Sequence, residues 1–124
     1  MPRPRPSSST ATPTATPATS ADVALGADGI TRIDSASSSY SATEMHLAAT
    51  NGFSGGYRRT ATSVGCTAIA GEGTGMERDY DFATKVYGAD LPDAAGIGTS
   101  AGEKAVKRLN PQKVSTAQVP VIFD

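Results

Sequence analysis

Alternation of apolar and polar residues with a period of two predicts several β-strands in the middle of the chain. Residues 40–50 alternate in this way, as do residues 76–82, which is typical of strands with two different faces. Between them, residues 57–70 form the longest β-prone run, with small, weakly apolar side chains on both faces. This composition predicts a central strand covered on both sides by close neighbours. A short β-prone run at 30–33 precedes these strands, and the serine-rich residues 34–39 fit either a loop or a strand.

Glycine-rich turns separate the predicted strands. Asn51-Gly52 is the dipeptide that most readily adopts positive φ in a hairpin turn, and Gly55-Gly56 is expected to widen that turn. Residues 71–75, GEGTG, form a second turn. The stretch 51–81 therefore predicts a turn, a long strand, a second turn and another strand, and the rest of the chain is expected to be built around it.

One helix is predicted in the C-terminal half. Pro92-Asp93 suits a helix start, because proline is tolerated in the first turn and aspartate is favourable at the positive end of the helix dipole. Asn110-Pro111 ends the helix. Glycines inside it each cost about 1 kcal/mol relative to alanine, so the helix needs tertiary support. The pattern as a whole predicts an α+β fold with a small, hairpin-rich antiparallel sheet and this single helix. The apolar stripe of the predicted helix, at helical spacing, consists of Ile97, Ala101, Ala105 and Leu109.

Residues 1–22 are predicted to be a disordered leader, followed by an ordered domain at 23–124. The first twenty residues contain five prolines and nine serines or threonines, so they cannot bury enough apolar surface to offset their ordering entropy. The prolines argue against the amphipathic helix of a transit peptide. A secreted stalk, a linker remnant and a mis-assigned start remain as alternatives.

The C-terminal residues 119–124, VPVIFD, form the most hydrophobic run in the sequence. A β-prone segment with no following turn predicts a strand that is cut off before its partner. The chain is therefore expected to be a fragment of a longer protein.

Composition limits the classes of protein that fit. With 124 residues there is room for one domain, and a chain so poor in large side chains is expected to borrow core from neighbouring domains or subunits. The net charge of -1 gives no general attraction to nucleic acid or anionic membranes. No run of 18 apolar residues exists, which excludes a transmembrane helix. The single cysteine, Cys66, cannot form an internal disulfide, which fits a reducing compartment.

Candidate chemical groups are few and each has a structural interpretation. His46 and Cys66 lie twenty positions apart without further metal-ligand spacing, so a polar strand residue and a small buried residue explain them. Three carboxylates, Glu77, Asp79 and Asp81, share one strand face about 7 Å apart. They suit a divalent cation or acid–base chemistry, or else a solvated face or a contact with a basic surface.

Two basic residues and one glycine motif complete the candidates. Arg58 and Arg59 have the chemistry to bind a carboxylate or phosphate, but they also suit an edge guard or a cross-strand partner of the acidic row. GEGTG leads into a strand and lacks the spacing of phosphate-binding loops. The sequence therefore predicts no catalytic, cofactor-binding or metal-binding residue.

Several blocks resemble the central domain of the TldD/PmbA (TldE) metallopeptidase family, in matching order and spacing. They are residues 51–60 (NGFSGGYRRT), 68–82 (AIAGEGTGMERDYDF), the predicted helix, 105–114 (AVKRLNPQKV) and 119–124 (VPVIFD). The resemblance covers roughly residue 30 to the end and excludes residues 1–20. The segments GMERDYDF and RLNPQKV resemble the PmbA/TldE branch more closely than the TldD branch.

The resemblance implies a role in a larger assembly. In this family, cytoplasmic TldD and TldE subunits pair into a complex that cleaves unfolded or modified peptides, and the zinc-binding HExxxH helix belongs to the TldD-type subunit. A TldD-like partner, peptide substrates reached through that complex, a cytoplasmic location and zinc in the partner subunit are therefore implied. No segment here matches HExxxH, so no catalytic or metal residue is carried over, and the fragment is expected to be inactive alone.

Two other functions remain open. One is a small, non-enzymatic protein-interaction module that uses the glycine loops and the acidic row. The other is the role of a modulator of DNA gyrase, which is the family's former description. The Arg58-Arg59 pair favours this role, whereas the net charge of -1 argues against binding of nucleic acid.

Overall fold

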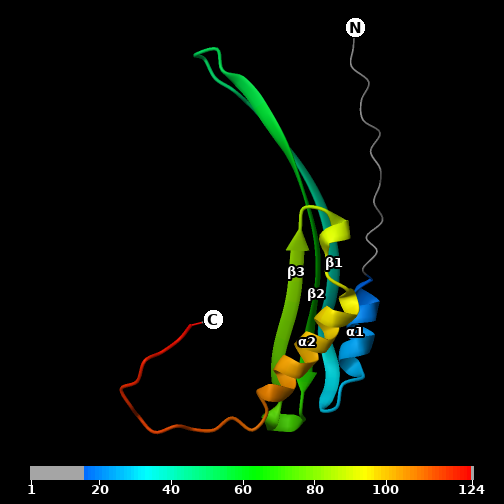
Figure 1. Ribbon diagram of the computed structural model, residues 1–124, viewed down its shortest axis with the longest axis vertical. Helices are drawn as coiled ribbons and strands as arrows, with labels where there is room; N and C mark the ends of the chain where they lie inside the picture. The colour runs from blue at the N-terminus through cyan, green and yellow to red at the C-terminus, as the bar shows by residue number, and fades with distance from the viewer. Residues whose placement is uncertain (1–15, 124) are drawn as a thin grey trace.

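The computed structural model describes residues 16–123. They form a three-stranded antiparallel sheet in the order β1-β2-β3, and two helices lie on one of its faces (Figure 1). The predicted α+β fold, with a helix in the C-terminal half, is confirmed. The elements are α1 (Pro17–Leu25), β1 (Ile30–Ala48), β2 (Ser54–Ala70), β3 (Glu77–Lys85) and α2 (Ala94–Lys107), with short 3-10 turns η1 (Gly73–Gly75) and η2 (Gly88–Asp90).

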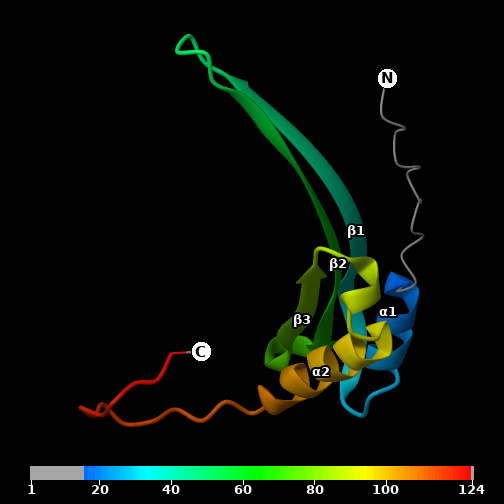
Figure 2. The ribbon, with the colours of Figure 1, turned by 45° about the horizontal axis from the view of Figure 1, so that its top comes forward.

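Strands β1 and β2 form one long hairpin that extends well beyond the rest of the domain. They pair from Ile30↔Ala70 to Ala48↔Ser54, whereas β3 pairs with β2 only from Thr62 to Ala70. Residues 41–61, here called the arm, therefore continue as a curved two-stranded ribbon (Figure 2). The serine-rich residues 34–39 lie inside β1, so the strand alternative was the right one.

The predicted Asn51-Gly52 turn closes the arm. Gly52 has φ 89, and the Asn51 side-chain oxygen accepts a hydrogen bond from the Phe53 amide at 3.1 Å. The loop at residues 49–53 is wider than two residues, as predicted, but Gly55-Gly56 does not widen it, because both residues belong to β2. Gly56 lies opposite His46, where an added Cβ would stand 2.4 Å from the Met45 carbonyl oxygen, so glycine is required for this close approach.

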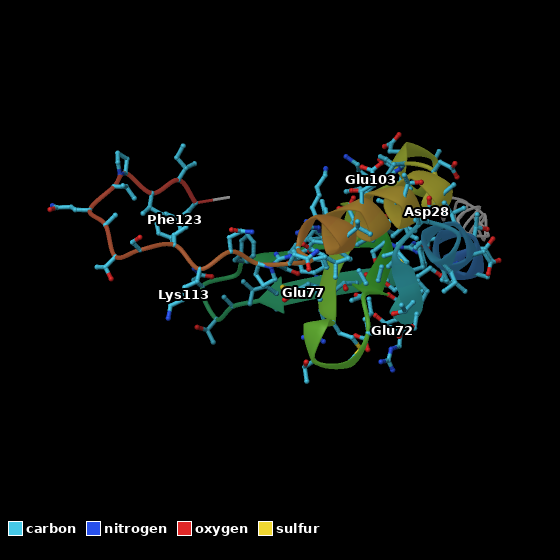
Figure 3. All side chains as sticks on the ribbon, turned by 90° about the horizontal axis from the view of Figure 1, so that it is seen from below. Asp28, Glu72, Glu77, Glu103, Lys113 and Phe123 are labelled. Carbon is cyan, nitrogen blue, oxygen red and sulfur yellow. The ribbon has the colours of Figure 1, made fainter. Side chains whose placement is uncertain are left out.

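The core lies between the helices and one face of β2, and it consists almost entirely of small side chains. The other face of β2 is only half-buried, so the predicted cover on both sides is wrong for the described residues. Both helices lie on the same side of the sheet (Figure 3). The buried apolar residues are Ala24, Val64, Cys66, Ala68, Ala70, Ala94, Ile97, Ala101 and Ala105.

Helix α1 occupies residues 17–22 of the predicted disordered leader, which is therefore wrong for that part. Pro17 begins the helix. Its missing backbone N–H costs no hydrogen bond there, because the first N–H groups of a helix have no partner within the helix. Ser20 and Ala24 are fully buried against α2. The helix is stabilised by packing through small residues, which hydrophobicity alone does not reveal. Residues 1–15 of the predicted leader lie outside the described residues.

Helix α2 packs on the sheet through the predicted stripe, and two of its glycines, Gly98 and Gly102, face α1. An added Cβ at Gly98 would stand 2.1 Å from the Ser20 carbonyl oxygen, and one at Gly102 would stand 3.4 Å from the Ala27 Cβ. These glycines let the two helices approach closely. Packing against α1 is therefore the tertiary support that the glycine content of α2 predicted. Within residues 16–123, neither α1 nor α2 has the length and hydropathy of a membrane-spanning helix.

The chain after α2 carries no regular secondary structure up to Phe123. The strand predicted at 119–124 is not formed over its described residues, because no neighbouring strand lies beside them to exchange backbone hydrogen bonds. Ile122 and Phe123 are almost fully exposed, and Figure 3 shows Phe123 on a segment that runs away from the sheet.

Candidate functional site

The acidic row of β3 faces helix α2. Arg108 donates a hydrogen bond from Nε to Asp79, and Lys104 Nζ lies 3.1 Å from an Asp81 carboxylate oxygen. The Asp79 and Asp81 side chains are only 16% and 26% exposed. The sequence left several alternatives open for the acidic row. In the structure Asp79 and Asp81 contact a basic surface, and this surface is formed by Lys104 and Arg108 of the same chain.

The spacing of the two elements explains this match. Lys104 and Arg108 lie one helical turn apart, roughly 6 Å, and two residues of a strand span about 7 Å. Two cations of α2 therefore meet two carboxylates of β3 in register. Lys104 and Arg108 also lie at the C-terminal end of α2, where the negative end of the helix dipole stabilises cations. The i, i+4 spacing of these cations was the signal in the sequence that the carboxylates point inward.

The pairs change the titration of the carboxylates. The hydrogen bond from Arg108 lowers the pKa of Asp79 below its ordinary value. Burial alone would raise the pKa of Asp81, but hydrogen bonds from Ser100 and Lys104 outweigh it and the pKa is lowered. In turn, the bond to Asp79 raises the pKa of Arg108. Both carboxylates are thus held ionised, which suits an ion pair and does not suit a proton donor near neutral pH.

Acid is expected to weaken the contact between β3 and α2. Because both carboxyl pKa values are lower in the folded than in the unfolded chain, their contribution to stability is present above about pH 4 and is lost as pH falls through the folded values. Asp81→Asn should lower the free energy of unfolding at pH 7 by about 0.5 kcal/mol, and this difference from the wild type should shrink below pH 4. Thermal unfolding from pH 7 to pH 2 measures it. Asp28→Asn, an exposed position outside the ion pairs of residues 16–123, should leave the profile unchanged; equal pH profiles for all three chains would contradict the expectation.

His46 and Cys66 do not meet. His46 lies opposite Gly56 on the arm, ten β2 positions or roughly 33 Å from Cys66. Its Nε2 lies 3.3 Å from the Ser54 hydroxyl. Cys66 is buried and its thiol contacts the Ser20 carbonyl oxygen at 3.8 Å; burial raises its pKa, and the Ser20 contact offsets only part of this. Such a thiol is a structural core residue and not a nucleophile.

The arginine pair and the glycine motif also have structural positions. Arg58 and Arg59 lie on the arm, beyond the end of β3, so the interpretation as cross-strand partners of the acidic row is wrong. Arg58 is opposite Glu44 instead. GEGTG forms the turn between β2 and β3, as predicted, with η1 inside it. Gly71 has φ 77, and an added Cβ would stand 2.8 Å from the Leu109 side chain, so its role is packing.

The open face of the sheet, opposite the helices, carries the groups that the sequence did not single out. Tyr80 and Phe82 are more than half exposed and stack with ring centroids 6.1 Å apart; this pair is here called the aromatic pad. Beside it, Arg78 and Asp34 form an ion pair at 3.6 Å. A depression of about 300 Å³ is lined by Asp34, Thr67, Arg78 and Tyr80 together with the Asp79–Arg108 pair of the helix side.

A second apolar surface lies at the end of the arm. Met45, Leu47, Phe53 and Tyr57, here called the tip patch, are each more than half exposed. They surround a depression of about 300 Å³ together with the backbone of Gly55 and Gly56. Over the described residues, neither surface contains a nucleophile with a base beside it or a set of metal ligands.

The residues do not fit the zinc ion that the family implies. Between residues 16 and 123, no three His, Cys, Asp or Glu side chains lie close enough together to hold a metal ion. The carboxylates of β3 are engaged by cations, and the buried thiol has no further ligand beside it. No chemical step through zinc is therefore derived for this chain, and the absence of catalytic, cofactor and metal residues stays a prediction.

Comparison with known proteins identifies the class to which this fold belongs. Residues 9–109 match the family model of the PmbA/TldA metallopeptidase central domain. The chain belongs to this family. The matched range begins before the predicted domain boundary at residue 23, so the statement that residues 1–20 do not resemble the family is wrong from residue 9 onward. Helix α1 lies inside the matched range.

Two curated relatives have particular names. The chain is 37% identical over 67 residues to "Metalloprotease PmbA homolog" of Haemophilus influenzae and 37% identical over 68 residues to "Metalloprotease PmbA" of Escherichia coli O157:H7. These alignments cover 54% and 55% of this chain. The chain aligns with about 15% of the length of each relative.

Two solved structures share the fold. One, titled a putative modulator of DNA gyrase from Bacteroides thetaiotaomicron, is 34% identical with a TM-score of 0.62, and the match covers 77% of this chain and 22% of that one. The other, a protein of the same description from Thermotoga maritima, has a TM-score of 0.72 over 80% of this chain and 23% of that one. At 13% identity, this second likeness shows the fold alone.

Proposed function

We propose that this chain is the central domain of a PmbA/TldE-like subunit, the partner without metal in a zinc-dependent TldD/TldE peptidase complex that cleaves unfolded or modified peptides. The observation that carries the proposal is the family match over residues 9–109, supported by relatives named metalloprotease PmbA. In this proposal the chain supplies no catalytic group and the TldD-like subunit supplies the zinc. The family further suggests a cytoplasmic location.

The geometry supports a structural and binding role for the domain. Asp79 and Asp81 are used in internal ion pairs with α2, whereas the aromatic pad and the tip patch stay exposed. A domain of this kind holds other parts of an assembly in place. The alternative of a non-enzymatic interaction module rests on the same two surfaces and differs only in the partner. The titles of the two solved structures describe modulators of DNA gyrase, but the net charge of -1 argues against direct binding of nucleic acid by this chain.

Reconstitution tests the proposal. The chain alone should hydrolyse no unfolded peptide, and it should co-purify with a co-expressed TldD-type protein carrying an HExxxH helix. Peptide cleavage should arise only in that mixture and should disappear with a chelator. Chelator-sensitive cleavage by the purified chain alone, or failure to associate with a TldD-type protein, would contradict the proposal. A matched control is the same mixture with the HExxxH glutamate of the partner replaced by glutamine, which should associate without cleaving.

A further inference from the structure

The turn at the end of the arm carries the one asparagine of the chain that precedes a glycine. The sequence contains two asparagines, Asn51 and Asn110, which are followed by Gly52 and Pro111. Both asparagines are exposed. The side-chain amide of an asparagine is open to attack by the backbone nitrogen of the next residue, and glycine obstructs this attack least because it has no Cβ. The two asparagines therefore differ in chemistry, and the surroundings of Asn51 decide whether the fold permits the reaction there.

The space around Asn51-Gly52 is open. Apart from its chain neighbours, an added Cβ at Gly52 would meet no atom of residues 16–123 within 4 Å. The turn lies at the free end of a ribbon that projects from the body (Figure 2). Gly52 has φ 89, a conformation that glycine adopts without steric cost. A ring can therefore close between Asn51 and Gly52 without the displacement of a neighbouring element.

The side-chain carbonyl of Asn51 is held and polarised by the backbone. Its Oδ1 accepts a hydrogen bond from the Phe53 amide at 3.1 Å. When the Gly52 nitrogen attacks Cγ of Asn51, negative charge develops on Oδ1. A donor already aimed at that oxygen stabilises the developing charge. The turn therefore favours the attack on Cγ.

One hydrogen bond opposes the attack. The Gly52 N–H donates to the Ala49 carbonyl oxygen at 3.0 Å, which holds the attacking nitrogen in the turn. This bond lies at the end of a two-stranded ribbon, and such a hairpin is only marginally stable in water. Exposed loop ends open locally at little cost in free energy. Breaking this single bond frees the Gly52 nitrogen, so brief openings of the turn are sufficient for the reaction.

We propose that Asn51-Gly52 is a deamidation site and that its conversion opens the turn at the end of the arm. A solvent base removes the Gly52 amide proton, the nitrogen bonds to Cγ of Asn51, and Nδ2 takes a proton from water and leaves as ammonia. Water then opens the resulting succinimide. Cleavage of the new bond to Cγ gives aspartate, whereas cleavage of the original peptide bond gives isoaspartate.

Isoaspartate changes the main chain of the turn. Its main chain runs through Cβ and Cγ and is longer by one methylene group. The bonds from Gly52 N–H to the Ala49 carbonyl and from Ala49 N–H to the Phe53 carbonyl, at 3.0 and 2.9 Å, then lose their geometry. Both products also place a carboxylate beside Phe53 of the tip patch, and an ionised group is costly to bury. The conversion therefore loosens the turn and weakens apolar contacts of the tip patch.

Peptide mapping by mass spectrometry tests the modification. The full chain is incubated in mildly alkaline water labelled with heavy oxygen. The Asn51 peptide should lose ammonia and take up the label, at a rate proportional to hydroxide concentration. Asn110 should stay intact, because the Pro111 nitrogen carries no hydrogen. The folded chain should convert within about a factor of ten of the rate in urea, since the turn opens easily. An Asn51 that converts only in urea, or no faster than Asn110, overturns the proposal.

Hydrogen exchange at the Ala49 amide tests the opening of the turn. The isoaspartate form, separated by chromatography, should exchange at Ala49 about tenfold faster or more than the unconverted chain. Freshly purified Asn51→Asp is the matched control, because it brings the carboxylate without the longer main chain and aspartate makes the same bond to the backbone. It should exchange like the wild type. Equal exchange before and after conversion would refute the opening, and so would equally fast exchange in Asn51→Asp, because charge alone would then be the cause.

Discussion

Gly98→Ala is expected to destabilise the domain by about 2 kcal/mol, even though alanine is the better helix former. An added Cβ would stand 2.1 Å from the Ser20 carbonyl oxygen, and that oxygen belongs to the backbone of α1 and cannot rotate away. Helices α1 and α2 must therefore separate. The same carbonyl accepts the Cys66 thiol, so the displacement also disturbs the contact of α1 with β2. Overpacking of this kind typically costs 1–3 kcal/mol, which exceeds the gain of about 1 kcal/mol in helix propensity.

The same substitution two residues earlier is the control. An added Cβ at Gly96 meets no atom within 4 Å, so Gly96→Ala should stabilise the domain by up to about 1 kcal/mol. Urea denaturation followed by circular dichroism measures both variants. The two changes are chemically identical and lie on one helix, so opposite signs report the packing of α1 directly. If Gly98→Ala proves as stable as Gly96→Ala, the close packing of the helices is wrong.

Ala68→Leu is expected to cost about 3 kcal/mol, the second large effect. Ala68 is fully buried on the inner face of β2, where α2 covers it with alanines such as Ala101 and Ala105. Apart from Val64 and Ile97, the buried core of residues 16–123 consists of small side chains. Its stability depends on how closely backbone elements approach, and three added carbon atoms force the helix away from the sheet.

Ala42→Leu separates this effect from the chemistry of the substitution. Ala42 lies in β1 on the arm and is exposed, so the larger side chain meets no packed neighbour. Its effect should stay within about 0.5 kcal/mol. Thermal unfolding of the two variants beside the wild type provides the comparison. A fall in melting temperature that is equal for both would mean that the interface between α2 and β2 is looser than described.

Periodicity in the sequence was sufficient to predict the sheet and α2. The stripe of Ile97, Ala101 and Ala105 repeats at the helical period, and the core confirms it. Helix α1 was missed because its buried residues are Ser20 and Ala24, small side chains that also dominate the sequence around them. Such a helix is specified by the glycines that it packs against, and Gly98 and Gly102 lie 78 residues after Ser20 and Ala24.

Alternation predicts that a strand has two faces but not which one points inward. In β3 the aromatic residues Tyr80 and Phe82 are exposed and the aspartates point to the helix, against the usual preference. The cations of α2 decide the orientation, because they are available at the matching spacing. Similarly, the alternation around Met45 predicts a half-buried strand, yet the arm extends past every element of the described chain that would cover it.

The length of the β1–β2 hairpin affects the order in which the domain folds. Short hairpins form from the turn outward, but here the turn at Asn51-Gly52 lies where no core exists, and the core contacts lie at the opposite end, near Ile30 and Ala70. Closing a forty-residue loop instead of a ten-residue one costs only about 1.2 kcal/mol more, since the cost grows with the logarithm of length. Burial of apolar surface at the base compensates for that difference. We therefore expect the body to form first and the projecting end to be the last part of the hairpin to form and the first to open.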